Sequence, residues 1–224
     1  MAKRASRPRP KAKPAGGKRK PAGRQIDTES WYEGKQFSFD WTTWHFPRWM
    51  KLLAPYQRRQ ARVLEIGSWE GRSAVFFLNY LPRAHLTCID SFRGGEEHRR
   101  MPGSAAFLRK VEKRFDANVR EFGGRVEKRK AQSSGALIAL GLERRRFDVA
   151  YVDGSHRAAD VYSDAHLTWP LIVRGGLVIF DDYLWDGMPG PLDIPRPGID
   201  AFLASIAGQY RLVLNDYQLA VVKR

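Results

Sequence analysis

The sequence predicts an α/β fold: a doubly wound, Rossmann-like domain around a seven-stranded, mostly parallel sheet with an antiparallel last strand. The first observation behind this prediction is that, from residue 61 onward, short apolar or β-rich runs alternate with segments of helical periodicity. Such alternation is typical of parallel strands joined by right-handed crossovers. The second is that only a short turn separates the last two predicted strands, which leaves no room for a crossover helix and favours antiparallel pairing.

Seven segments carry the strand pattern. Phe147–Asp153 and Gly175–Tyr183 are the strongest, because both are nearly continuous apolar runs of the kind that a parallel sheet buries on both faces. Arg125–Ala131 is a weaker candidate. The other four strands are expected at Arg62–Ile66, His85–Asp90, Tyr210–Asn215 and Gln218–Val222.

Helical spacing of apolar residues marks the segments around these strands. Phe46–Leu53 and Pro197–Ala207 each have a proline in the first turn, where its missing N–H is tolerated. Ser133–Leu142 opens with a serine that can cap a helix. Further helices are expected at Arg72–Leu81, Ala105–Phe122 and Ala158–Val173, and a solvated loop rather than a site is expected at Glu96–Arg100.

The 224 residues suffice for one domain with a substantial core, and the chain divides into three segments. Residues 1–24 contain ten Lys or Arg and no acidic, aromatic or branched aliphatic residue, so we expect a disordered basic tail. Residues 25–60 are rich in Trp, Tyr and Phe and are expected to cover a core edge or line a pocket. Residues 61–224 carry the regular α/β pattern.

Most of the net charge of +15 belongs to the tail, because residues 25–224 carry only +5. Nucleic-acid binding therefore cannot be inferred from the overall charge. We expect the tail to solubilise the chain or to make weak contacts with nucleic acid or another anionic surface.

Several classes of protein are excluded by composition. The single cysteine, Cys88, rules out an intramolecular disulfide, and no apolar run approaches the roughly 20 residues of a membrane span. The basic start is not followed by the apolar segment of a standard signal peptide, so we expect a cytoplasmic protein. The oligomeric state stays open, a homo-oligomer included.

A turn with two glycines follows the first predicted strand, as Glu65-Ile66-Gly67-Ser68-Trp69-Glu70-Gly71. Glycines four positions apart let the backbone turn tightly and bring its N–H groups close to a ligand. The spacing differs from the Gly-x-Gly-x-x-Gly of dinucleotide-binding proteins. The Glu65 carboxylate would repel a pyrophosphate and suits a cationic ligand. The expected ligand contacts in this turn are Glu65, Gly67, Ser68, Trp69 and Gly71.

The ends of the second and third strands add further candidates. Asp90, 25 positions after Glu65, is placed to accept hydrogen bonds from two ribose hydroxyls, with Ser91 beside it. Phe92 could lie against an adenine ring. Gln132 and Ser133 stand at a helix start, where they either meet an adenine amine or simply cap the helix.

These segments, followed by Phe147–His156 and Gly175–Tyr183, resemble the class I methyltransferases that use S-adenosylmethionine. Within that superfamily the chain looks like small bacterial enzymes related to the catechol and caffeoyl-coenzyme A O-methyltransferases and to the sugar O-methyltransferases of antibiotic pathways. The resemblance runs from about Trp41 to Arg224, and it implies that residues 61–224 are the methyltransferase domain.

In the relatives, carboxylates at the ends of the fourth and fifth strands hold a divalent metal, which by position implies Asp153, Asp181 and Asp182 as ligands of Mg²⁺. The catechol-type pattern ends in Asp-Asn, whereas this chain has Asp-Asp, a departure that favours the sugar-modifying branch. Three neighbouring carboxylates repel one another unless a cation neutralises them, and oxygen ligands suit Mg²⁺. His156, on the loop after Asp153, is the candidate general base, and Asp153 also lies beside the cofactor.

The resulting prediction is an O-methyltransferase acting on a small hydroxylated acceptor, such as a sugar or a glycosylated metabolite. A metal-independent or N-directed methyltransferase is the first alternative. The second is a nucleic-acid-associated protein or RNA modifier that uses the basic tail. A nicotinamide-dependent oxidoreductase is disfavoured by Glu65 and by the missing third glycine.

Overall fold

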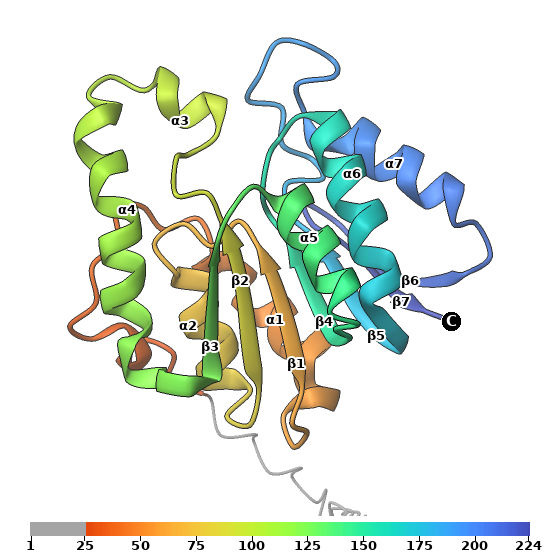
Figure 1. Ribbon diagram of the computed structural model, residues 1–224, viewed down its shortest axis with the longest axis horizontal. Helices are drawn as coiled ribbons and strands as arrows, with labels where there is room; N and C mark the ends of the chain where they lie inside the picture. The colour runs from red at the N-terminus through yellow and green to blue at the C-terminus, as the bar shows by residue number, and fades with distance from the viewer. Residues whose placement is uncertain (1–25) are drawn as a thin grey trace, which may run out of the picture.

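The computed structural model describes residues 26–224, and its centre is a seven-stranded sheet in the order β3-β2-β1-β4-β5-β7-β6 (Figure 1). Strands β1 to β5 run parallel, and β7 is antiparallel to both of its neighbours, β5 and β6. The strand order reverses between β1 and β4, which is where this class of fold binds its ligands. The predicted fold class is confirmed. The strands are β1 Arg62–Ile66, β2 His85–Asp90, β3 Val126–Lys130, β4 Phe147–Val152, β5 Ile172–Phe180, β6 Tyr210–Asn215 and β7 Leu219–Lys223.

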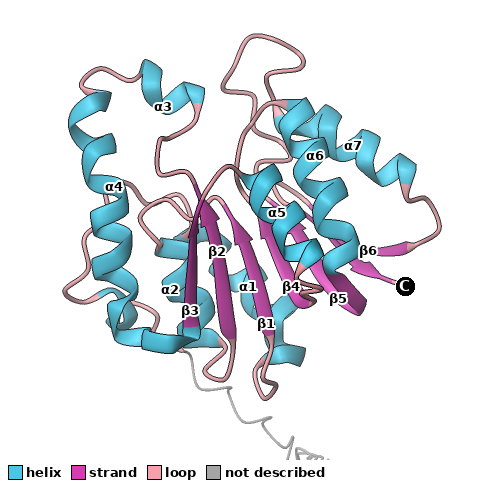
Figure 2. Ribbon diagram, viewed as in Figure 1, coloured by secondary structure: helices cyan, strands magenta, loops and turns pink. Residues whose placement is uncertain are grey.

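Helices cover both faces of the sheet, as Figure 2 shows. One face packs against α1 (Phe46–Leu53), α2 (Arg72–Tyr80) and α4 (Ser104–Val119). The other packs against α5 (Ser133–Leu142), α6 (Ala158–Thr168) and α7 (Pro195–Ser205). Alternate residues of each central strand enter opposite cores, which is why the strands read as continuous apolar runs.

Several local predictions are corrected by the structure. The helix predicted at Pro197–Ala207 spans Pro195–Ser205, and the strand predicted at Gly175–Tyr183 spans Ile172–Phe180. The helix predicted to reach Val173 ends at Thr168, because Trp169–Leu171 form a 3₁₀ turn around Pro170 and Ile172 already begins β5. The long helix α4 ends at Val119 instead of Phe122. Glu96–Arg100, expected as a loop, forms the short helix α3. The predicted serine cap of α5 is also wrong, because Gln132 occupies the cap position and makes no side-chain cap bond.

The aromatic-rich N-terminal segment is held onto the sheet domain by polar contacts. The Glu70 carboxylate, fully buried, accepts hydrogen bonds from Ser38 Oγ at 2.8 Å and from the Arg114 guanidinium at 2.6 Å. Arg72 donates two hydrogen bonds to Asp40, at 2.8 and 2.7 Å. Trp41 and Trp44, which follow Asp40 in the sequence, lie at the carboxyl ends of the strands. The basic tail, residues 1–24, lies outside the described residues, in which no helix is long and apolar enough to cross a membrane.

Candidate active site

A pocket of about 930 Å³ opens at the carboxyl ends of β1, β2, β4 and β5. Its volume is at the upper end of the roughly 300–1,000 Å³ that small-molecule sites occupy, so it has room for two ligands side by side. Ten of the residues singled out in the sequence line it: Gly67, Trp69, Asp90, Ser91, Gln132, Ser133, Asp153, His156, Asp181 and Asp182.

Gly67 is the tightest point of the turn after β1. Its φ is +83°, in the left-handed region that disfavours a side chain. A Cβ at this position would lie 1.7 Å from the carbonyl oxygen of Asp153. Gly71, with φ +82°, starts α2, and a Cβ there would lie 3.1 Å from the Phe115 ring. Backbone conformation therefore favours glycine at both positions, and close packing against the Asp153 backbone also requires it at Gly67.

Asp90 holds the glycine turn in place. Its Oδ2 accepts backbone N–H bonds from Ser68 at 2.8 Å and Trp69 at 2.7 Å, and its Oδ1 accepts the N–H of Phe92 at 2.6 Å. Burial nevertheless raises the pKa of this carboxyl. Each carboxylate oxygen has two lone pairs, so a ribose hydroxyl could share Asp90 with these amides.

Four of the expected cofactor contacts do not line the pocket: Glu65, Ser68, Gly71 and Phe92. Glu65 is fully buried beneath the turn, where it accepts a hydrogen bond from Ser73 Oγ at 2.5 Å, and burial raises its pKa to about 7. The left-handed φ of Phe92, +56°, turns its ring into the core, 5.3 Å from the Phe115 ring. Direct contact of these four residues with a cofactor stays a prediction.

Sequence reasoning missed a second wall of the pocket. The His98 ring, in α3, stacks on Trp69 with centroids 4.4 Å apart and planes at 26°. Trp41 lies 5.3 Å from His98 and 5.8 Å from Trp69, so three segments distant in sequence meet there. Asp164 of α6 also lines the pocket, and burial raises its pKa to about 6. The many aromatic residues before residue 60 were the one sequence feature that indicated this wall. No feature of the sequence indicated Asp164.

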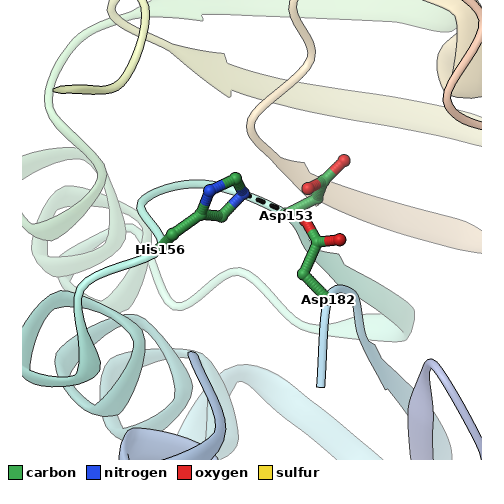
Figure 3. Close-up of side chains that lie close together, drawn as sticks. All are labelled: Asp153, His156 and Asp182. Carbon is green, nitrogen blue, oxygen red and sulfur yellow. Dashed lines mark ion pairs between the residues drawn. The ribbon is translucent and has the colours of Figure 1, made fainter. Parts of the chain in front are cut away.

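The candidate reacting centre lies at the ends of β4 and β5. The His156 Nε2 is 2.9 Å from Asp182 Oδ2, as the dashed line in Figure 3 marks. One ligand atom from each of Asp153, His156 and Asp182 lies within 4.8 Å of the others, a spacing that a metal ion could bridge. Tyr217, from the turn between β6 and β7, donates its hydroxyl to Asp182 Oδ1 at 2.8 Å. The other carboxylate oxygen of Asp182 is thereby aimed at His156.

The Asp181 carboxylate has different hydrogen-bond partners from the Asp182 carboxylate. One oxygen accepts the Tyr151 hydroxyl, and the other accepts the Asp182 N–H at 2.7 Å and lies 3.6 Å from His45 Nε2. Burial and the Asp182 charge raise the pKa of Asp181, and burial together with both neighbouring carboxylates raises that of Asp153. The carboxyls of Asp153 and Asp181 therefore resist ionisation unless a cation compensates their charge.

His45 is a structural histidine at the base of the centre. It is 1% exposed, and its ring lies parallel to Trp49 with centroids 5.7 Å apart. Burial lowers its pKa to about 4, so the imidazole is neutral at physiological pH. Trp44 on one side and Trp185 on the other line the pocket near the centre, and the Trp185 ring is 4.3 Å from His156.

Known proteins resemble the chain in sequence and in architecture. A family model described as a methyltransferase domain matches residues 64–183. An uncharacterized protein of Acanthamoeba polyphaga mimivirus is 25% identical over 143 residues, 62% of this chain and 59% of that protein. The mycinamicin VI 2''-O-methyltransferase of Micromonospora griseorubida is 27% identical over 187 residues, 79% of this chain and 40% of that enzyme.

Among solved structures, the MycE methyltransferase in complex with Mg, SAH and mycinamycin VI has a TM-score of 0.60 and 20% identity, and the match covers 83% of this chain and 50% of that one. The chain thus spans about half the length of the relatives that it matches. At this level of identity the structural likeness establishes the fold.

Proposed function

Because the chain belongs to the methyltransferase-domain family, we propose that it transfers the methyl group of S-adenosylmethionine to a hydroxyl of a small acceptor, such as a sugar or a glycosylated metabolite. One observation carries the proposal: the glycine turn and the pair of His156 and Asp182 line the same pocket, which has room for a cofactor and an acceptor. The mycinamicin relative, a 2''-O-methyltransferase, supports the choice of oxygen as the acceptor atom.

The proposed reaction needs alignment and one proton acceptor. The acceptor oxygen bonds to the methyl carbon, the bond from that carbon to the sulfonium sulfur breaks, and the sulfur keeps the electron pair as a thioether. The hydroxyl proton passes to His156 Nδ1, because the Nε2–H of the same ring is directed at Asp182 Oδ2, 2.9 Å away. The Asp182 carboxylate then stabilises the imidazolium that forms. Holding the two substrates in line supplies a large part of the acceleration.

The residues at the centre also fit a divalent cation. Carboxylates of Asp153, Asp181 and Asp182 converge there, and within residues 26–224 no Lys or Arg forms an ion pair with Asp181 or Asp182. Their basic neighbours are the neutral His45, 3.6 Å from Asp181, and His156, 2.9 Å from Asp182. When bound, Mg²⁺ would neutralise the carboxylates and lower the pKa of an acceptor hydroxyl.

Two arrangements of the metal follow from these contacts. In the first, Asp153, Asp181 and Asp182 would hold the metal and His156 would act as the base. In the second, Asp153, Asp182 and His156 are the ligands, as their atoms within 4.8 Å favour. Without a metal, the pair of His156 and Asp182 would act alone.

Mn²⁺ titration followed by electron paramagnetic resonance separates these arrangements. In the first, His156→Ala leaves Mn²⁺ affinity unchanged and lowers turnover by roughly 10²–10⁴-fold, as expected for loss of a general base. In the second, His156→Ala weakens Mn²⁺ binding and Asp181→Asn does not. Full activity in excess EDTA would contradict both arrangements and indicate a metal-independent enzyme.

The acceptor class is tested by SAH release. The purified chain is incubated with S-adenosylmethionine and a panel of sugar glycosides, phenols and amino sugars, and SAH and methylated products are measured by mass spectrometry. We expect products methylated on oxygen and an activity that His156→Ala removes. Methylation of the amino-sugar nitrogen in preference to the hydroxyls would establish an N-directed enzyme instead.

A further inference from the structure

The edge of the sheet opposite the pocket is strongly basic. The parallel strands begin at this edge, where Arg62 pairs with His85, and Lys223 ends β7 beside Tyr210 (the lower ends of β1, β2 and β3 in Figure 1). We define the basic edge as the segments at these strand ends: residues 57–62, 81–85, 120–126, 143–148, 172–176, 207–211 and 222–224.

Positive charge is concentrated at the basic edge. The basic edge contains thirteen Lys or Arg and three acidic residues, a net charge of +10. Residues 26–224 together carry +5, so everything outside the edge carries −5. Most of the edge cations are also accessible: ten are exposed, namely Arg58, Arg59, Arg62, Arg83, Arg120, Arg144, Arg146, Arg174, Arg211 and Arg224.

The three acidic residues of the edge are already paired. Glu121 contacts Lys35 at 2.7 Å, Glu143 contacts Arg129 at 2.6 Å, and Asp148 contacts Arg62 at 3.5 Å. They leave little negative charge to compensate the exposed arginines. Cations of like sign crowded on one surface repel one another unless an external anion neutralises them.

We propose that the basic edge binds the phosphate backbone of a nucleic acid. Twelve of its thirteen cations are arginines, whose planar guanidinium suits bidentate contact with phosphate better than the lysine ammonium does. The cations are spread over the starts of successive strands, which matches a repeating polyanion better than a single phosphate group. The exposed Phe and Trp side chains of residues 26–224, Phe39, Trp41 and Trp44, belong to the N-terminal segment instead, so bases have no exposed platform here to stack on.

Binding at this edge is independent of methyl transfer. The pocket opens at the other ends of the strands, where Asp153, Asp181 and Asp182 would repel a polyanion. The nucleic acid is thus a docking partner rather than the acceptor, and it leaves the pocket open while the domain is held on it. The ten Lys and Arg residues of residues 1–24 also attract a polyanion, so the experiment uses the full chain.

The experiment compares two triple variants of the full chain that lose the same charge. The edge variant combines Arg146→Ala, Arg174→Ala and Arg224→Ala, three exposed arginines without an ion pair in the described part of the chain. The control variant neutralises three exposed cations of α4 that likewise lack an ion pair there: Arg109→Ala, Lys110→Ala and Lys113→Ala. Binding of a fluorescent RNA duplex of mixed sequence is measured by anisotropy over a range of NaCl concentrations.

The logarithm of the association constant should decrease linearly with the logarithm of the salt concentration. We expect the magnitude of this slope to become smaller by roughly 2–3 in the edge variant and by less than about 1 in the control, because each phosphate contact contributes roughly 0.9. Calorimetric titration with S-adenosylmethionine should be unchanged in both variants. Equal losses in the two variants would show that only net charge matters and would overturn the proposal. Tighter binding to phosphatidylglycerol vesicles than to the duplex would overturn it in favour of a membrane surface.

Discussion

Gly67→Ala is the substitution for which the structure predicts the largest local effect. Gly67 has φ +83°, and an added Cβ would stand 1.7 Å from the Asp153 carbonyl oxygen, far inside van der Waals contact. The left-handed conformation costs a non-glycine residue about 1–2 kcal/mol. Relief of the overlap requires the backbone of one strand end to move, which adds about 1–3 kcal/mol. The free energy of unfolding should therefore fall by about 2–5 kcal/mol.

Gly208→Ala is the matched control. Gly208 has nearly the same φ, +81°, but a Cβ there would meet no atom within 4 Å. Urea unfolding of both variants separates the two contributions, since Gly208→Ala should cost only the conformational part, about 1–2 kcal/mol. Because Asp153 lies in the reacting centre, Gly67→Ala should also weaken binding of S-adenosylmethionine, and Gly208→Ala should not. Equal losses of stability in the two variants would show that the close approach of Gly67 to Asp153 is wrong.

Three further predictions concern single side chains. Asp90→Ala leaves two backbone N–H groups of the glycine turn and that of Phe92 without their acceptor, and it should weaken S-adenosylmethionine binding by about 1–3 kcal/mol in calorimetry. Unchanged affinity would exclude Asp90 from the cofactor site. Glu65 has a pKa of about 7 in the folded chain against an ordinary 4.5, so its contribution to the free energy of unfolding should fall as pH rises between these values. In urea unfolding, Glu65→Gln should make the free energy of unfolding less dependent on pH in this range. An unaltered pH profile would contradict the burial of the Glu65 carboxylate. Tyr217→Phe removes the hydrogen bond to Asp182 and should weaken Mn²⁺ binding about 10-fold. Tyr80→Phe, which removes a hydrogen bond to the Met50 carbonyl and does not line the pocket, should leave Mn²⁺ affinity unchanged.

The strands and the glycine turn were predictable because their signals are local. The apolar runs of β4 and β5 follow from burial on both faces. The glycine turn was recognisable because Gly67 and Gly71 both have a positive φ, which favours glycine. The start of β5 was misplaced because Ile172 and Val173 continue the apolar pattern of the preceding helix, and only Pro170 marks the break.

Contacts between distant segments could not be derived from the sequence in this way. Phe92 is adjacent to the pocket in sequence, but its left-handed backbone turns the ring into the core, and sequence alone does not fix the sign of φ. Glu65 lies beneath the turn because Ser73, eight residues on, accommodates its carboxylate. Tyr217 reaches Asp182 from across 35 residues through a turn that carries no recognisable motif.

Calorimetric titration of the purified chain with S-adenosylmethionine tests most directly whether the pocket is a methyl-donor site. One molecule should bind per chain, Gly67→Ala should weaken that binding, and Gly208→Ala should leave it unchanged. Absence of binding to a folded wild-type chain, or equal binding by the wild-type and Gly67→Ala chains, would show that the pocket at the ends of β1, β2, β4 and β5 does not hold this cofactor.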